Sequence, residues 1–209
     1  MRAPATWWAF PRLDALLAEG PLRQKSDGTT RRHRDFYRGL AFLAELEAVY
    51  RGGAPPPYWA TQCEHLDLRG LRQDLRLHYP VELVTELHDL LVVARRNLPR
   101  YKDLIYNPVF GGKFGGVQVG ADGDLLLDDL LLELKTKNDS VPELRSILQL
   151  LGYAALDAMR GNNRVRRVGI YNSRWGLLWT EELETVSRIL GWSSSAEFRA
   201  LLEKTMAGC

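Results

Sequence analysis

The residues of this sequence best suited to chemistry are two carboxylates and a lysine carried by a pair of short apolar runs. Three leucines at 125–127 and three at 130–132 are separated by Asp128-Asp129. Runs this short, bounded by Gly and Asp, are typical of buried strands in a hairpin rather than of a helix. The sequence therefore predicts a hairpin whose loop is Asp128-Asp129.

This loop sets the register of the predicted hairpin. Leu127 faces Leu130, and counting outward pairs Asp124 with Glu133, their Cβ atoms roughly 5 Å apart. Like charges so placed are destabilising unless a cation cancels them, and a divalent ion is the obvious candidate. Lys135 follows two residues after Glu133, so strand alternation puts it on the same face.

A second interpretation of these three residues is a solvated ionic face on an amphipathic hairpin. The leucines argue against it, because they occupy both faces and indicate strands buried on both sides. A carboxylate pair and a lysine inside such a sheet are costly unless they are organised for a task. The pattern favours a functional site.

The spacing Asp, eight residues, Glu-x-Lys resembles the motif of the PD-(D/E)XK nuclease superfamily. Gln149 and Tyr153 extend the resemblance, because a Gln-x-x-x-Tyr on the helix after the lysine strand is similar to the RecB-like branch. One departure is Gly123, which stands where the motif has proline.

The resemblance implies an α/β fold with a small mixed central β-sheet flanked by helices, a restriction-endonuclease-like core with an N-terminal helical extension. The expected organisation is an extension over 1–80 for substrate or partner contacts, a nuclease core over 81–180, and C-terminal helices over 181–209 that pack on the core.

The resemblance also implies the roles of the site residues. Asp124, Glu133 and the backbone carbonyl of Leu134 would bind Mg²⁺, for which Mn²⁺ would substitute. Lys135 would position or deprotonate the attacking water, and Gln149 and Tyr153 would brace the ligands and the phosphate. Asp122, opposite Lys135 in the predicted register, and Glu86, on a helix before the sheet, are further candidate metal ligands.

Basic residues outside this motif are candidates for phosphate contacts. They are Arg31, Arg32 and Arg34 in a predicted basic loop over 22–34, Lys113 in a Gly-rich turn, and Arg145 on the helix of Gln149. A solvated loop is the alternative for the arginines, and a tight turn is the favoured reading of the glycines around Lys113.

The expected function is a metal-dependent nuclease that hydrolyses phosphodiester bonds. DNA is the expected substrate, and repair, restriction or defence against phage is the expected setting. The alternatives are a non-catalytic nuclease-fold subunit that binds nucleic acid or a partner protein, and a plain interaction protein. The chain could form a homodimer or be a partner subunit of a larger complex under any of these functions.

Composition sets broader limits on the class of protein. The chain has 209 residues, 45% of them hydrophobic, a net charge of +2 and two cysteines. This is an ordinary soluble composition without a basic coat, a disulfide framework or an apolar run long enough to span a membrane. A reducing cytoplasm is the expected location.

The remaining expectations concern the helices and strands that position the site. Helices are predicted over 35–53 with Asp35 as N-cap, 61–78, 81–98, 142–160, 180–192 with Thr180 as N-cap, and from Ser193–Ser195 to about Met206. A first strand is predicted within 104–118 and two more within 164–180, where Arg164, Arg166 and Arg167 form an exposed or phosphate-facing edge.

Overall fold

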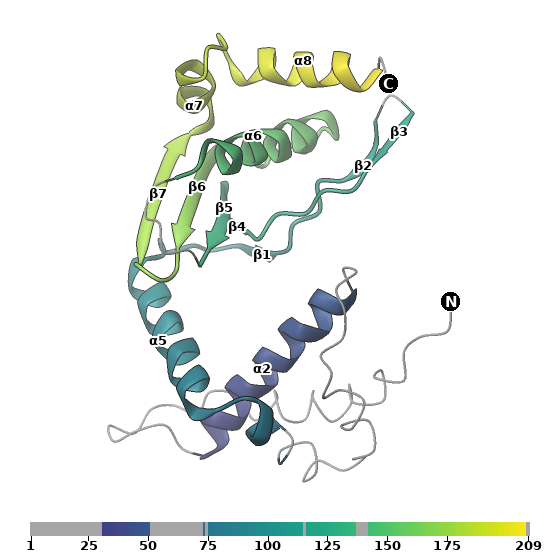
Figure 1. The fold of residues 1–209 in the computed structure, drawn as a ribbon. Coiled ribbons are helices and arrows are strands. Elements are labelled where there is room, and N and C mark those ends of the chain that lie inside the picture. Colours follow the sequence, from purple (N-terminus) through teal and green to yellow (C-terminus); the bar gives the residue numbers. More distant parts are fainter. Residues whose placement is uncertain (1–30, 51–72, 74, 115, 137–141, 208–209) are drawn as a thin grey trace. The chain divides into compact units, whose positions relative to one another are not determined.

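The structure is a computed structural model that describes residues 31–50, 73, 75–114, 116–136 and 142–207 (Figure 1). The chain forms two compact units, Met1–Leu91 and Val92–Cys209, with the boundary inside one helix, α5 (Val81–Asn97). The second unit holds the sheet and the residues of the predicted motif.

A mixed five-stranded sheet in the order β1-β4-β5-β6-β7 is the framework of the second unit. Its strands are β1 (Leu104–Tyr106), β4 (Leu125–Leu127), β5 (Leu130–Lys135), β6 (Arg167–Asn172) and β7 (Leu177–Glu182). Only β5 and β6 pair in parallel, and α6 (Leu144–Met159) forms the crossover between them. The sequence prediction of an α/β protein with a small mixed sheet is confirmed at this level.

The hairpin of β4 and β5 has the register predicted from its two-residue loop. Leu127 pairs with Leu130, and the ladder ends where Leu125 pairs with Leu132. The loop needs a backbone that L-residues seldom adopt, because Asp128 has φ 55°. Its carboxylate compensates by accepting hydrogen bonds from the backbone N–H groups of Lys102 and Asp103, which hold the pKa of Asp128 below its ordinary value.

Both faces of the hairpin are buried, as the leucine pattern predicted. Leu126 and Leu131 point into the main core of the unit, where they meet Leu150 and Leu151 of α6. The leucines of opposite parity, Leu125, Leu127, Leu130 and Leu132, pack on the other face with Leu98, Leu104 and Leu178. Period-two alternation between two cores therefore decides which side chains of β5 face α6.

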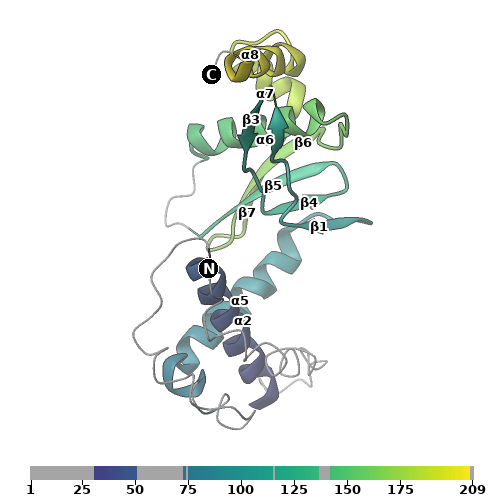
Figure 2. The same ribbon diagram turned by 90° about the vertical axis from the view of Figure 1, so that its right-hand side faces the viewer.

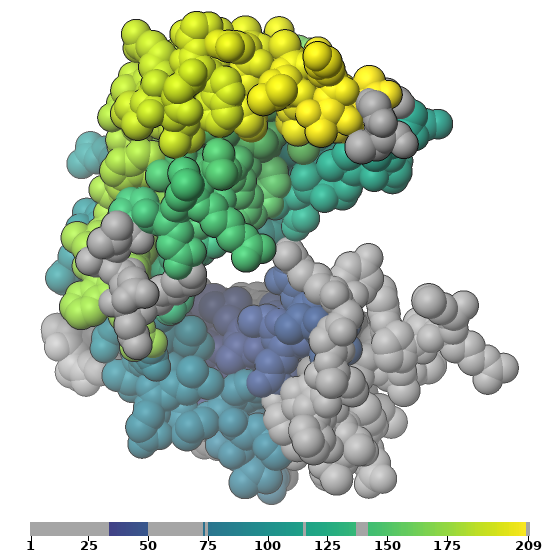
Figure 3. All heavy atoms as spheres, turned by 45° about the horizontal axis from the view of Figure 1, so that its top comes forward, coloured from purple at the N-terminus to yellow at the C-terminus, as the bar shows by residue number. Residues whose placement is uncertain are grey.

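Helices form two further layers on the α6 face of the sheet (Figure 2). The helix α6 lies between the sheet and α8 (Ser195–Ala207), and Phe198, Leu202 and Met206 of α8 pack on the main core. Figure 3 shows the yellow C-terminal helices lying over the green of α6. The short helix α7 (Leu183–Ile189) connects β7 to α8.

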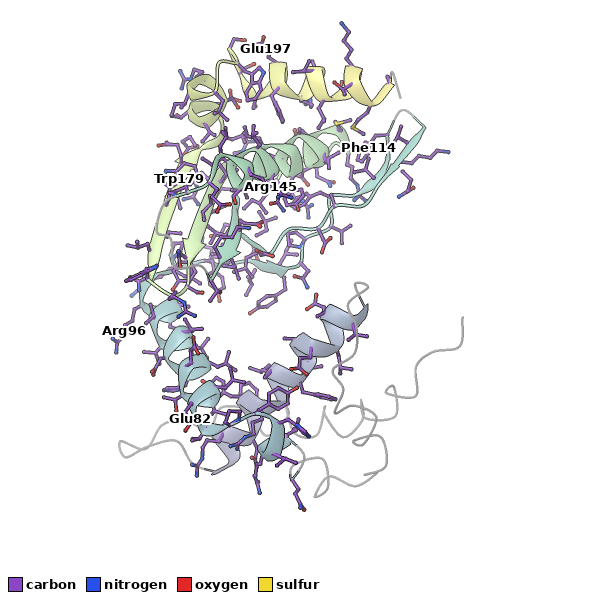
Figure 4. All side chains as sticks on the ribbon, in the orientation of Figure 1. Glu82, Arg96, Phe114, Arg145, Trp179 and Glu197 are labelled. Atoms are coloured by element: carbon purple, nitrogen blue, oxygen red, sulfur yellow. The ribbon has the colours of Figure 1, made fainter. Side chains whose placement is uncertain are left out.

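Instead of the single first strand predicted within 104–118, the chain forms β1 and a second hairpin, β2 (Gly112–Phe114) with β3 (Val117–Val119). Gly116 has φ 91° between β2 and β3, so the predicted tight turn is confirmed at this glycine, whereas Gly112 lies within β2. Phe114, labelled in Figure 4, is buried against the main core and anchors this hairpin.

The first unit corrects the prediction for its N-terminal helix. The basic loop predicted over 22–34 ends earlier, because α2 (Arg31–Tyr50) already includes Arg34, and Asp35 is no cap. Asp35 is buried inside the helix, where it accepts hydrogen bonds from Arg38 and Arg76. Asp35 is therefore the carboxylate of a buried ion-pair cluster with two guanidinium groups.

Two further boundaries differ from the prediction. Thr180 lies in β7, paired with Gly169, and α7 begins at Leu183, because the ladder with β6 continues to Glu182. The helix predicted over 61–78 lies mostly outside the described residues, and residues 75–78 are helical. Within the described part of the chain, no helix combines the length and apolar character that crossing a bilayer requires.

Candidate functional site

Glu133 and Lys135 form an ion pair at the carboxyl end of β5. The Lys135 Nζ lies 2.7 Å from Glu133 Oε1, and the Glu133 side chain is only 9% exposed. The two residues share the sheet face of Leu131, which is the face covered by α6. A buried carboxylate on an otherwise apolar strand is costly and indicates a specific role.

Asp124 lies directly before β4 and reaches across to the same segment of β5. Its Oδ2 accepts a hydrogen bond from the backbone N–H of Leu134 at 2.6 Å. The ladder does not continue to an Asp124–Glu133 pair, because β4 begins at Leu125. The carboxylate of Asp124 nevertheless lies against the residue between Glu133 and Lys135.

The backbone before Asp124 explains why the sequence has glycine where the motif has proline. Gly123 donates its N–H to the carbonyl of Pro108 at 2.9 Å, a bond that proline has no N–H to make. A Cβ at this position would lie 3.0 Å from Phe110 Cε2 and 3.1 Å from Leu131 Cδ1. Chain pairing and close packing therefore both favour glycine here.

The helix α6 places Gln149 and Tyr153 over the same face of the sheet. Because α6 starts after β5 and returns to the beginning of β6, its first half, with Gln149, lies toward the Glu133 end of the sheet, and Tyr153 follows one turn later. Gln149 Nε2 donates to the Tyr153 hydroxyl at 2.6 Å. The Tyr153 ring stacks on Phe110 with 5.4 Å between the ring centroids, which holds the hydroxyl in place.

The donor set fits a small hard cation such as Mg²⁺. Carboxylate and carbonyl oxygens are the ligands that Mg²⁺ prefers, and Mg²⁺ usually keeps several waters and uses one or two carboxylates. Among the described residues, Glu133 and Asp124 each use one oxygen in the bonds given above, so Glu133 Oε2 and Asp124 Oδ1 are available there to another ligand. Among the described residues no three His, Cys, Asp or Glu side chains come together, so water or substrate would complete the shell.

Of the other candidate metal ligands, Asp122 belongs to the second unit but not to this group, and Glu86 belongs to the first unit. Asp122 is exposed and forms an isolated bridge with Val109, so the predicted register opposite Lys135 is wrong. The backbone bonds of 107–111 with 121–124 keep Asp122 on the β1 side of the sheet. Glu86 is exposed on α5 within the first unit.

The predicted phosphate-binding residues are spread over several elements. Arg31, Arg32 and Arg34 fall at the start of α2, in the first unit. Lys113 on β2 and Arg145 on α6 are exposed in the second unit (Arg145 is labelled in Figure 4).

The predicted arginine edge before β6 is mainly structural. Arg164 pairs with Asp157 at 2.7 Å, and Arg167 pairs with Asp129 at 2.6 Å. Arg166 is exposed. The first two guanidinium groups are therefore committed to carboxylates of the fold itself.

Sequence reasoning missed a set of polar residues at the end of β6, beside Lys135. Asn172 is the register partner of Lys135 in the parallel ladder and is buried. Ser173 donates its backbone N–H to the carbonyl of Lys135 at 2.8 Å, and its Oγ lies 2.8 Å from Thr136 Oγ1. The signal was available, because a strand–helix–strand order predicts parallel pairing and places the polar end of RVGIYN beside the end of β5.

A pocket of about 300 Å³ lies elsewhere, between α6, α7 and α8. None of the five residues Asp124, Glu133, Lys135, Gln149 and Tyr153 lines it. Glu184, on its wall, is already engaged by the hydroxyl and the backbone N–H of Ser195. This pocket is therefore separate from the group of residues at the end of β5.

Comparisons with family models, with curated proteins and with solved structures give no significant match to this chain.

Proposed function

We propose that this protein is a metal-dependent nuclease of the PD-(D/E)XK type, with a restriction-endonuclease-like core. The observation that carries the proposal is the meeting of Asp124 with the Glu133-Leu134-Lys135 segment. One carboxylate is buried beside an ammonium, and the second carboxylate binds the backbone between them. An amphipathic hairpin with a solvated ionic face would not bury Glu133.

The chain's own residues would divide the reaction as follows. Asp124, Glu133 and the Leu134 carbonyl would hold Mg²⁺, or Mn²⁺ in its place. When bound, the ion polarises the scissile phosphate and lowers the pKa of the attacking water. Lys135 would bring its ammonium to the same face, where it would stabilise the charge that develops on the phosphate, or, as the neutral amine, would take a proton from the water.

Gln149 and Tyr153 would orient this site through their mutual hydrogen bond. The Gln149 amide fixes the Tyr153 hydroxyl, and stacking on Phe110 fixes the ring. Such supporting contacts hold the residues that bind a metal in the productive geometry. The expected substrate is nucleic acid, with DNA favoured, in repair, restriction or defence against phage, and the cytoplasm is the expected location.

The decisive experiment uses Lys135→Ala, because this change leaves both carboxylates in place. Wild type and variant are incubated with plasmid, linear duplex, single-stranded DNA and RNA in Mg²⁺. Cleavage should fall by at least about 10²-fold in the variant, the lower end of what a positioned acid–base group contributes. Lys204→Ala, on the exposed side of α8, is the matched control and should cleave like wild type.

Lys135→Arg should not restore cleavage, because a guanidinium has a different shape and does not give up its proton. Equal cleavage by wild type and Lys135→Ala would refute this site. If neither cleaves although the ion binds, the chain acts as a non-catalytic subunit that binds nucleic acid or a partner.

A further inference from the structure

We propose that Asn172 is a positioning residue, which receives the Lys135 ammonium when a divalent cation occupies Glu133. The inference rests on the proposed metal site and adds to it a residue on another strand. Asn172 is the last residue of β6 and the register partner of Lys135.

Asn172 and Lys135 share one face of the sheet. In a strand, side chains alternate between faces, and Val168 and Ile170 of β6 belong to the main core under α6. Asn172, two residues after Ile170, therefore points to the α6 side. By the same alternation Lys135, four residues after Leu131, points there too.

Placing asparagine at position 172 is energetically unfavourable unless its amide has a polar partner. Asn is depleted in strands, and burying its amide is unfavourable unless its polar atoms are used. Asn172 is 5% exposed and follows the apolar run of Val168, Ile170 and Tyr171. Packing alone would favour another apolar residue here, so the amide has a polar task.

Lys135 and a divalent cation would compete for the Glu133 carboxylate. The Lys135 ammonium sits 2.7 Å from Glu133 Oε1. A dication on the same carboxylate would lie within a few ångströms of it, and like charges so close repel. Loading of the site therefore drives Lys135 Nζ away from Glu133.

The displaced Lys135 ammonium needs another hydrogen-bond acceptor. On β6, the neighbours of Glu133 and Lys135 on this face are Ile170, which is apolar, and Asn172, whose amide oxygen can accept a hydrogen bond. The backbone itself is held, because Ser173 donates its N–H and its hydroxyl to the carbonyl of Lys135 at 2.8 and 3.2 Å. The movement is then a rotation of the lysine side chain from Glu133 to Asn172.

The test is a double-mutant cycle read out as Mn²⁺ affinity, measured by electron paramagnetic resonance of free Mn²⁺ without any nucleic acid. Asn172→Leu keeps a similar volume and removes the acceptor, so binding should weaken about tenfold, as expected for losing a hydrogen bond to a charged group. Lys135→Met removes the competing cation and should bind at least as tightly as wild type. In the Lys135→Met background, Asn172→Leu should change the affinity by less than about twofold.

Asn97→Ala, exposed on α5, is the control and should leave Mn²⁺ affinity unchanged. If the leucine variant does not fold, Asn172→Ala replaces it, with the same ratios expected. Equal loss in both backgrounds would show a role independent of Lys135, and no loss in either would show no role; both overturn the inference while leaving the metal site standing. Absence of Mn²⁺ binding by wild type would overturn the metal site together with the inference.

Discussion

Two buried carboxylates at opposite ends of the sheet, Asp157 and Glu133, are satisfied in different ways. Asp157, near the end of α6, is 1% exposed and accepts hydrogen bonds from the backbone N–H and guanidinium of Arg164 and from the Asn162 amide. Glu133, near the end of β5, is also buried, and its partner among the described residues is the Lys135 ammonium.

The two hydrogen-bonding patterns distinguish a carboxylate whose bonds hold the fold together from one that can still bind a ligand. Both oxygens of Asp157 accept hydrogen bonds, which tie the end of α6 to the turn before β6. Glu133 is held by the flexible side chain of Lys135, which can move away. Among the described residues, its second oxygen makes no hydrogen bond and can bind a ligand. Burial alone would not distinguish them.

The largest expected effect is the loss of cleavage on neutralising the carboxylates of the β5 end. Glu133→Gln and Asp124→Asn should each reduce cleavage to background, because an amide is a poor ligand for Mg²⁺. Thermal melting in metal-free buffer should change little for Asp124→Asn, whose amide oxygen can still accept from the Leu134 N–H, and should fall for Glu133→Gln, which leaves the Lys135 ammonium without its carboxylate. A fall as large for Asp124→Asn would instead make this carboxylate a structural residue like Asp157.

Metal replacement should have a similarly large effect on activity alone. Mg²⁺ or Mn²⁺ should support cleavage, and Ca²⁺ should not, because Ca²⁺ accepts the same oxygens in a looser geometry. Cleavage assays with each ion, and melting curves with and without chelator, separate catalysis from folding. Full activity in excess chelator would contradict the metal site.

The opposite pattern is expected for Asp157. Asp157→Asn should lower the free energy of unfolding by about 2–3 kcal/mol, because it weakens several charged hydrogen bonds of a buried group. Cleavage per folded molecule should stay within about twofold of wild type, since no site residue is touched. Urea denaturation and an assay normalised to folded protein test both, and a larger loss of cleavage would mean that the two ends are coupled.

The smallest expected effect concerns Glu184, a third carboxylate, which lies near the surface. Hydrogen bonds from the hydroxyl and backbone N–H of Ser195 hold the pKa of Glu184 below its ordinary value of 4.5. Its contribution to stability is therefore present above about pH 4.5 and lost as the pH falls through the lower, folded-state pKa.

Ser195→Ala removes the stronger of these bonds. It should reduce the difference in unfolding free energy between pH 7 and pH 3 by less than about 1 kcal/mol, because solvent screens the group. Urea titrations at the two pH values measure it, with Ser194→Ala as control. An unchanged difference would mean that Glu184 titrates equally in both states.

The sequence alone determined the local architecture around the site. Two leucine runs and a two-residue loop are enough to set a register, because the side-chain period of a strand is two and a slip would expose an apolar face. The pairing of Leu127 with Leu130 and the extent of α5, α6 and α8 followed from such short-range rules. The types and spacing of Asp124, Glu133 and Lys135 came from the same segment.

Tertiary structure alone decided which distant groups meet these residues. Chain pairing beside Pro108 fixed Gly123 and directed Asp124 to the Leu134 N–H rather than into the ladder. The crossover through α6 brought Asn172 to Lys135, and long-range pairing with Arg76 kept Asp35 inside α2. Periodicity reports which face a side chain takes, whereas its partner depends on contacts between segments far apart in the chain, which no local pattern encodes.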